Sequence, residues 1–141
     1  MKFKEIAQGF IRQAELRVET AENAFNKEEM AYAVRQAQES VELALKAALN
    51  WVHIEHPRFH DVSPILKEKK DAFPSWFRQK IEQFANTSRE LARKREPAMY
   101  GVETRGLAAD KLFTKEETRE ILQTATQVVR NVKKLVTSSP S

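Results

Sequence analysis

Apolar residues recur at steps of three or four along most of the chain, and this period constrains the fold more than any other feature. It is typical of one face of an α-helix, which completes a turn in about 3.6 residues. Two long stripes open the sequence, and each predicts one long helix. The first is Phe3, Ile6, Phe10, Ala14, Val18, Ala21 and Phe25. The second is Met30, Val34, Ala37, Val41, Leu45, Ala48 and Val52.

Glycine and cysteine are too scarce for the main alternatives. With 3 glycines in 141 residues, neither G-x-G-x-x-G nor the P-loop pattern can be written, and the regular turns of a β-sandwich are missing. The absence of cysteine excludes a disulfide scaffold, a thiolate zinc site and a cysteine nucleophile. We therefore expect an all-α fold, a single up-and-down bundle of four to five helices. One domain would span residues 1–141, with its core at about 3–136 and a flexible tail at 137–141.

Capping residues and prolines predict where the helices of the first half begin and end. Asn26 with Glu29 has the spacing of a capping box and predicts the start of the second helix. Pro57 predicts the end of that helical region, because the residue before a proline is disfavoured in the α conformation. Ser63 followed by Pro64 then predicts the N-cap and first residue of a short third helix.

Prolines also bound the fourth predicted helix, which begins at Pro74 and stops at Pro97. Its stripe is Phe77, Ile81, Phe84, Ser88 and Leu91. Residues 97–113 predict a loop, and Thr114 with Glu117 predicts a capping box at the start of the last helix. The stripe of that helix is Ile121, Ala125, Val128, Val132 and Leu135.

The charge balance permits an anionic partner without identifying one. The 24 Lys and Arg exceed the 20 Asp and Glu by four, which gives a net charge of +4. The first ten residues interleave charges with apolar residues, which argues against an export signal. No apolar run approaches the roughly 18 residues of a membrane span. We expect a cytoplasmic protein without a membrane segment.

Three histidines, His53, His56 and His60, lie close together and raise the question of a metal site. On a helix, the spacing of three would put the first two on neighbouring faces, but Pro57 interrupts that geometry before His60. We expect neither a metal site nor a cofactor. Instead, we interpret the histidines as helix-end residues, with His60 and Asp61 capping or orienting the short third helix.

The densest basic segment lies near the end of the fourth predicted helix. An arginine beside an aromatic ring that can stack is suited to a nucleotide or an RNA phosphate. The other interpretation is a solvated face whose cations complement the helix C-terminus. The segment consists of Arg89, Arg93, Lys94 and Arg95, and Tyr100 follows it.

Glu42 and Lys46 on the second helix form a second candidate pair. Glutamate four residues before lysine is the favourable order for an ion pair on a helix surface, which explains the pair without any function. Alternatively, both side chains point into a cleft and belong to a site.

Together, these segments resemble the HEPN domain family over roughly residues 5–136. The resemblance rests on Gln-Ala at 36–37, Glu-Leu-x-Leu-Lys-Ala at 42–47, His-Asp at 60–61 and the segment 93–101. It implies a bundle of four or five helices that pairs as a homodimer. In prokaryotes, such proteins are often encoded beside a minimal nucleotidyltransferase, as toxin and antitoxin. Catalytic members are metal-independent RNases with an Arg-x(4–6)-His motif at the dimer cleft.

The chain departs from the family at this RNase motif. The fifth residue after Arg93 is Ala98, and the fifth after Arg95 is Tyr100. Metal-free RNA cleavage needs a group that transfers a proton near neutral pH, which alanine cannot do. The resemblance therefore favours binding over catalysis. It also places Tyr100 where some toxin members are modified by the nucleotidyltransferase. The candidate binding residues are Arg93, Arg95, Tyr100, Arg89, Glu42 and Lys46.

Three functions remain open on the sequence. The first is a non-catalytic nucleotide- or RNA-binding HEPN module that acts as a homodimer with a nucleotidyltransferase partner in a toxin–antitoxin system. The second is a metal-independent ribonuclease that uses Arg93 or Arg95 with Tyr100, or a histidine upstream such as His60. The third is a purely structural helical interaction protein whose basic segment is a solvated face.

Overall fold

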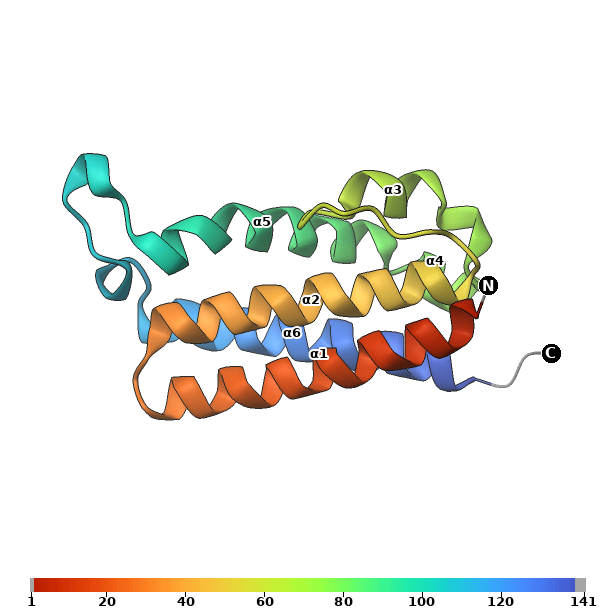
Figure 1. Cartoon of the computed structure of the whole chain (residues 1–141), viewed down its shortest axis with the longest axis horizontal. Coiled ribbons are helices and arrows are strands. Elements are labelled where there is room, and N and C mark those ends of the chain that lie inside the picture. Colours follow the sequence, from red (N-terminus) through yellow and green to blue (C-terminus); the bar gives the residue numbers. More distant parts are fainter. Residues whose placement is uncertain (1, 139–141) are drawn as a thin grey trace.

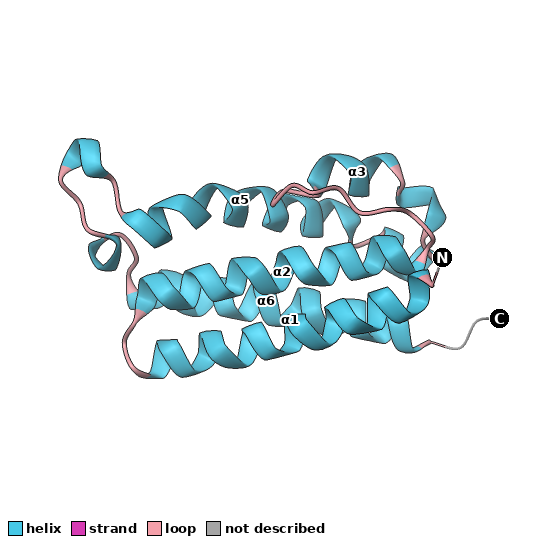
Figure 2. Ribbon diagram, in the orientation of Figure 1, coloured by secondary structure: helices cyan, strands magenta, loops and turns pink. Residues whose placement is uncertain are grey.

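The computed structural model describes residues 2–138 and forms an up-and-down helical bundle. Four long helices run alternately in opposite directions, and two short α-helices lie between the second and third of them (Figures 1 and 2). The long helices are α1 (Phe3–Asn26), α2 (Met30–Trp51), α5 (Ile81–Tyr100) and α6 (Lys115–Thr137). The short ones are α3 (Ser63–Glu68) and α4 (Ser75–Arg78). The all-α bundle predicted from the apolar periods is confirmed.

Helix α2 is the centre of the bundle and packs against α1, α5 and α6. Its alanines at 44, 47 and 48 are fully buried and carry no side chain beyond Cβ, so that neighbouring helices can approach closely. Leu45 and Leu49 fill the space between the helices and are also fully buried. Truncating either leucine to alanine would cost about 2–5 kcal/mol. None of the described helices is long and apolar enough to cross a bilayer.

The core face of α1 lies about one residue away from part of the predicted stripe. Ala7, Ile11 and Ala14 are almost fully buried, whereas Ile6 is 40% exposed. Both sets have helical spacing, and the structure selects the one that faces α2 and α6. The existence of the helix was predictable, but its rotation about its own axis is set by its neighbours.

The turn between α1 and α2 corrects the prediction for Asn26. This residue is the last one of α1, and the N-cap of α2 is Glu29, which makes no side-chain cap. The chain reverses through Glu28, whose φ is +62°. The backbone N–H of Glu29 then bonds to the Ala24 carbonyl at 2.9 Å. Backbone hydrogen bonds therefore close this turn instead of the predicted capping box.

The end of α2 corrects the prediction for Pro57, because the helix stops at Trp51. His53 has a φ of +64°, in the left-handed region, and its N–H bonds to the Asn50 carbonyl at 3.0 Å. All three histidines therefore lie in the loop after α2, and His53 and His56 do not share a helix. We call residues 52–62, which connect α2 to α3, the strap.

The fourth predicted helix is divided in the structure. Pro74 is the N-cap of the four-residue α4, and the long helix α5 begins only at Ile81. Helix α5 also continues through Pro97, which was predicted to stop it. Proline forfeits one backbone hydrogen bond, but the N–H of Gly101 still bonds to the Pro97 carbonyl at 2.8 Å. Gly101, with a φ of +72°, ends the helix.

The loop between α5 and α6 contains two 3₁₀ turns, Glu103–Arg105 and Ala109–Lys111, and an isolated antiparallel bridge between Val102 and Leu107. The Thr114 half of the predicted capping box is confirmed, because the Thr114 hydroxyl accepts the N–H of Glu117 at 3.0 Å. The Glu117 carboxylate pairs with Lys94 at 3.6 Å instead of completing the box.

The predicted tail begins inside α6. Thr137 is the last residue of that helix, and its hydroxyl donates to the Lys133 carbonyl at 2.7 Å. Residues 139–141 of the predicted tail lie outside the described residues.

Candidate functional site

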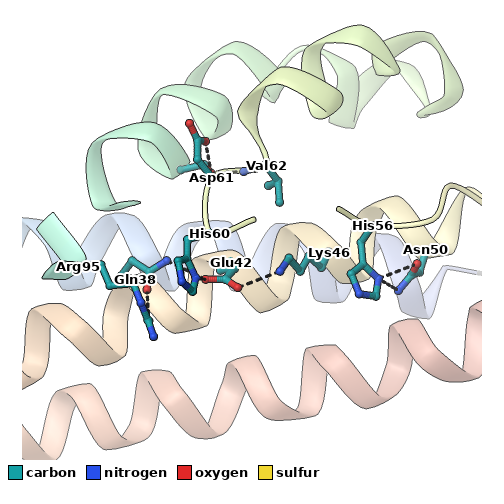
Figure 3. Close-up of polar contacts among 10 residues, drawn as sticks. Gln38, Glu42, Lys46, Asn50, His56, His60, Asp61, Val62 and Arg95 are labelled. Carbon is teal, nitrogen blue, oxygen red and sulfur yellow. Dashed lines mark hydrogen bonds and ion pairs between the residues drawn. The ribbon is translucent and has the colours of Figure 1, made fainter. Parts of the chain in front are cut away.

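A row of polar side chains follows one face of α2. Gln38, Glu42, Lys46 and Asn50 are spaced four apart, which places them one above the other on the helix. Gln38 is 1% exposed, Lys46 8% and Asn50 2%. The row faces the strap and the C-terminal part of α5 (Figure 3). Burying so many polar groups is costly unless each finds a partner. The structure supplies these partners within the row itself and from the strap and α5.

Glu42 is the centre of the row and is held by three side chains. Lys46 Nζ lies 2.9 Å from Glu42 Oε2, and the Gln38 amide donates to Oε1 at 3.0 Å. His60 Nδ1 lies 2.8 Å from Oε1. Burial raises the pKa of Glu42, but these three hydrogen bonds and the charge of Lys46 outweigh it and lower the pKa below its ordinary value. Glu42 is therefore a carboxylate at neutral pH.

The ionised Glu42 fixes the orientation of His60. A carboxylate only accepts hydrogen bonds, so the proton of a neutral His60 ring lies on Nδ1. The second ring nitrogen, Nε2, then carries a lone pair that can accept a proton or a hydrogen bond. The side chain of His60 is 57% exposed, whereas that of Glu42 is 14% exposed. The nearly buried carboxylate of Glu42 therefore holds the exposed imidazole of His60 in one orientation.

Arg95 brings a second cation to the same cluster from α5. Its Nη1 donates to the Gln38 amide oxygen at 2.8 Å. Because the amide nitrogen of Gln38 bonds to Glu42, one side chain links the arginine to the carboxylate. We call Gln38, Glu42, Lys46, His60 and Arg95 the α2 cluster. It combines two permanent cations with one carboxylate and an exposed imidazole (Figure 3).

The strap is anchored at the end that leads into α3. Asp61 accepts the Ser63 N–H and the Ser88 hydroxyl, each at 2.9 Å, and the Val62 N–H donates to the Ser88 oxygen at 3.1 Å. Burial alone raises the pKa of Asp61, but the hydrogen bonds from Ser63 and Ser88 and the charge of Arg89 lower it overall. The N-cap of α3 is Val62, which makes no side-chain cap. Asp61 orients the start of the helix by accepting the N–H of its first residue, Ser63. His60 contacts Glu42 instead.

The strap is also anchored where it leaves α2. The Asn50 side-chain amide is hydrogen-bonded to His56 Nδ1, which lies 3.1 Å from Nδ2 and 3.3 Å from Oδ1. The His56 ring packs edge-on against Phe10 of α1, with centroids 4.9 Å apart. Burial, followed by the charge of Lys46, lowers the pKa of His56. His53 makes a similar edge-on contact with Phe3 at 5.5 Å. No group of three or more His, Asp or Glu side chains in residues 2–138 is arranged to hold a metal ion.

The structure divides the predicted site residues between separate places. Only Arg95 joins Glu42 and Lys46. Arg93 is exposed, with its Nη1 3.9 Å from a Glu90 oxygen. Lys94 pairs with Glu117 of α6 at 3.6 Å, and Arg89 donates to the Asn86 side chain at 3.0 Å. The basic segment is therefore not one continuous patch.

Arg93 and Tyr100 share a different hollow at the end of α5, with a volume of about 680 Å³. Glu96 and Glu103 line the same hollow, so that the carboxylates outnumber the one arginine. Tyr100 is 65% exposed. This balance of charge does not favour an anionic ligand.

Gln38 and Asn50 were not among the sequence candidates, although both are central to the arrangement. A neutral amide gives little signal by itself. The signal available in the sequence is the row at 38, 42, 46 and 50, four polar residues at steps of four on a helix that is otherwise rich in Ala, Val and Leu. The link to Arg95 has no local signal, because it joins α2 to α5.

The chain is a small all-α domain that carries a cluster of charged and polar side chains between two of its helices. A family model of the HEPN domain matches residues 7–135, and the chain belongs to this family. The family relates the chain to nucleotide- and RNA-associated functions. Comparisons with curated proteins and with solved structures gave no significant match.

Proposed function

We propose that this chain is a nucleotide- or RNA-binding HEPN module and that the α2 cluster binds the phosphate of its ligand. The observation that carries the proposal is the convergence of Arg95 and Lys46 on the linked pair Gln38 and Glu42. Two cations against one carboxylate leave an excess of one positive charge. A local positive excess attracts phosphate oxygens.

The arginine is the better phosphate ligand of the two cations. Lys46 is 8% exposed and already bonded to Glu42 at 2.9 Å, so its charge acts mainly through space. Arg95 is half-buried and uses one N–H group on Gln38, which holds the guanidinium in place. Its other N–H groups remain suited to a bidentate contact with a phosphate. An arginine held in this way loses less conformational entropy on binding.

A binding role without Arg-x(4–6)-His catalysis is supported by Ala98. Counted from Arg93, the motif allows histidine at positions 98 to 100, and these are Ala98, Met99 and Tyr100. Ala98 is 5% exposed. Its methyl group cannot transfer a proton.

The two arginines Arg95 and Arg93 provide a matched test of the proposed function. We expect Arg95→Ala to weaken binding of a labelled single-stranded RNA or nucleotide by about tenfold or more, because a charge-assisted hydrogen bond is lost. Arg93→Ala removes the same charge two residues away, outside the cluster, and should change the affinity by much less. Fluorescence anisotropy at several salt concentrations measures both variants. Binding should weaken as salt rises, with a shallower slope in Arg95→Ala. Equal effects of the two variants, or no binding by the wild type, would reject the assignment.

A second candidate function is metal-independent RNA cleavage with His60 as the general base. The specific observation in its favour is the 2.8 Å contact of His60 Nδ1 with Glu42, which leaves Nε2 to accept a proton. An RNA cleavage assay in EDTA, comparing the wild type with His60→Gln, tests it. No cleavage by the wild type would remove this candidate and leave the binding function in place.

We further propose that the chain acts as a homodimer and with a minimal nucleotidyltransferase, in a toxin–antitoxin pair, with Tyr100 as the modified residue. Family membership supports this proposal, and the 65% exposure of Tyr100 makes its hydroxyl accessible to an enzyme. Incubation with the partner and ATP, followed by peptide mass spectrometry, should locate the modification at Tyr100. Tyr32, which is 46% exposed on α2, is the internal control. Unmodified Tyr100, or a monomer in light scattering at micromolar concentration, would contradict the respective part.

A further inference from the structure

The tip of the strap carries a cation, an aromatic ring and an imidazole in succession, Arg58, Phe59 and His60. All three residues are exposed. His60 is bonded to Glu42, as described above. Within residues 2–138, by contrast, Arg58 forms no hydrogen bond or ion pair with a side chain, and Phe59 packs against no other ring and joins no apolar cluster. The fold therefore gives no structural role to the first two residues of the triplet.

Phe59 is 71% exposed, more than any other large apolar side chain in the described chain. Leaving such a ring in water forgoes about 1.5–3 kcal/mol of burial free energy. Tyr100, at 65%, is the next most exposed aromatic residue, and it lies in a different place. Tyr100 shares its hollow with two glutamates, whereas Phe59 directly precedes a residue that is bonded into the cluster.

The strap is held on both sides of this triplet, so that its tip is not a loose loop. Before it, His56 is fixed by Asn50 and by the ring of Phe10. After it, Asp61 is fixed by Ser63 and Ser88. A short segment between two anchored residues presents its side chains at small entropic cost, as binding loops on rigid scaffolds do.

We propose that the tip of the strap binds an unpaired nucleobase by stacking it on Phe59, while Arg58 adds a positive charge beside the ligand. This inference rests on the proposed function and extends it, because it names the part of the ligand that lies next to the phosphate on the α2 cluster. An exposed aromatic ring next to cations is the arrangement by which proteins hold single-stranded nucleic acids. Bases within a duplex are already stacked on their neighbours, and their faces are not accessible to Phe59. The site therefore selects unpaired bases.

The test uses the full chain with four probes: a single-stranded RNA, its duplex, an abasic strand of the same length and a mononucleotide. We expect the wild type to prefer the single strand to the duplex and to the abasic strand. Phe59→Leu removes the aromatic face but keeps an apolar side chain. It should lose about tenfold in affinity for the single strand, because one stacked base is lost. Its affinity for the abasic strand should not change. Phe59→Trp keeps an aromatic face and should therefore keep the preference for the strand with bases over the abasic strand.

Leu16→Ala is the matched control, because Leu16 is 57% exposed on α1 and belongs to none of these clusters. It should leave every affinity unchanged. If Phe59→Leu loses as much affinity for the mononucleotide as for the RNA strand, the ligand that stacks is a free nucleotide. A loss confined to the strand identifies RNA.

Two outcomes would overturn the inference, and they are distinguishable. If the wild type binds strands with and without bases equally, and Phe59→Leu binds like the wild type, the phosphate site stands and the base platform is rejected. If the wild type binds none of the four probes, the proposed function fails and the inference fails with it.

Discussion

Arg95 on α5 donates to the amide oxygen of Gln38 on α2 at 2.8 Å, across 57 positions of sequence. Gln38 is 1% exposed, so this contact fixes the arginine against a buried group. The same glutamine bonds to Glu42 at 3.0 Å, and the position of Arg95 is thereby tied to that of His60. Any displacement of α5 along α2 would change the distance between Arg95 and Lys46, the two cations of the proposed phosphate site.

The ion pair of Lys46 and Glu42 is nearly buried, and breaking it should destabilise the fold. The two side chains are 10% and 14% exposed. Lys46→Met keeps the apolar stem but leaves Glu42 without its cation. We expect a loss of about 2 kcal/mol in the free energy of unfolding, typical of a lost charge-assisted hydrogen bond. Urea unfolding measures it.

Lys133→Met is the control for that experiment. Lys133 lies 2.9 Å from Glu15, but the side chains of this pair are 50% and 40% exposed. Solvent-exposed pairs contribute under about 1 kcal/mol. Similar losses in the two variants would contradict the difference that we derive from burial.

His56 should make stability depend on pH in a window of its own. Its pKa in the folded protein is lowered from an ordinary value of 6.5, first by burial and then by the charge of Lys46. The unfolded chain therefore binds this proton more readily than the folded chain. The contribution of His56 to the free energy of unfolding is therefore fully present above pH 6.5 and is lost as the pH falls through the lowered pKa. Urea unfolding between about pH 8 and pH 5 should show the loss in the wild type and a flatter dependence in His56→Gln.

Stability should fall again at lower pH in both proteins of that comparison. The pKa values of Glu42 and Asp61 in the folded protein lie below their ordinary values of 4.5 and 3.8, so their contributions persist above those values and disappear only in more acidic solution. A His56→Gln protein that loses stability between about pH 8 and pH 5 as steeply as the wild type would show that another group titrates there.

The cap of α6 should contribute measurably to stability. Thr114→Ala removes the acceptor of the Glu117 N–H, and such caps contribute about 1 kcal/mol. Thr124→Ala is the matched control. Its hydroxyl only bonds back to the Glu120 carbonyl within α6, and alanine has the higher helix propensity, so that change should be neutral or slightly stabilising. Thermal unfolding of the two variants decides, and a cap variant as stable as the control would be evidence against the role of Thr114.

Two glycines with positive φ should respond differently to alanine. At Gly101, an added Cβ would collide with the Leu107 carbonyl and the Ala109 nitrogen. At Gly106, there is no atom within 4 Å of the added Cβ, so that only the left-handed backbone at a φ of +64° opposes the change. We expect Gly106→Ala to cost about 1 kcal/mol and Gly101→Ala distinctly more. Equal melting temperatures for the two variants would disagree with this geometry.

The sequence predicted the features that depend on local periodicity and on capping chemistry. The stripe of α6 and its cap at Thr114 are examples, because residues close in sequence determine both. It failed where a backbone turn replaced a side-chain cap, as at Asn26, and where a helix continued through Pro97. In those places, backbone hydrogen bonds form that do not depend on the type of side chain, so the sequence pattern does not indicate them.

The candidate site was predictable only in part, because most of its contacts join residues that are distant in the sequence. Glu42 and Lys46 form a local pair, four residues apart on one helix. The partners that turn this pair into a cluster come from the strap and from α5, 18 and 57 positions away from the residues they contact. Among four neighbouring basic residues, the direction of each side chain separates Arg95 from the rest, and no spacing rule gives that direction.

The strap separates the residues that hold the fold from those available to a ligand. Asn50, His56 and Asp61 carry its anchoring contacts, while Arg58 and Phe59 lie between the anchors. Under the base platform that we propose, mutations at these two positions would change the ligand preference with little loss of folding stability. On such a rigid scaffold, related proteins can acquire new ligand preferences by substituting residues 58 and 59 while the helical bundle stays the same.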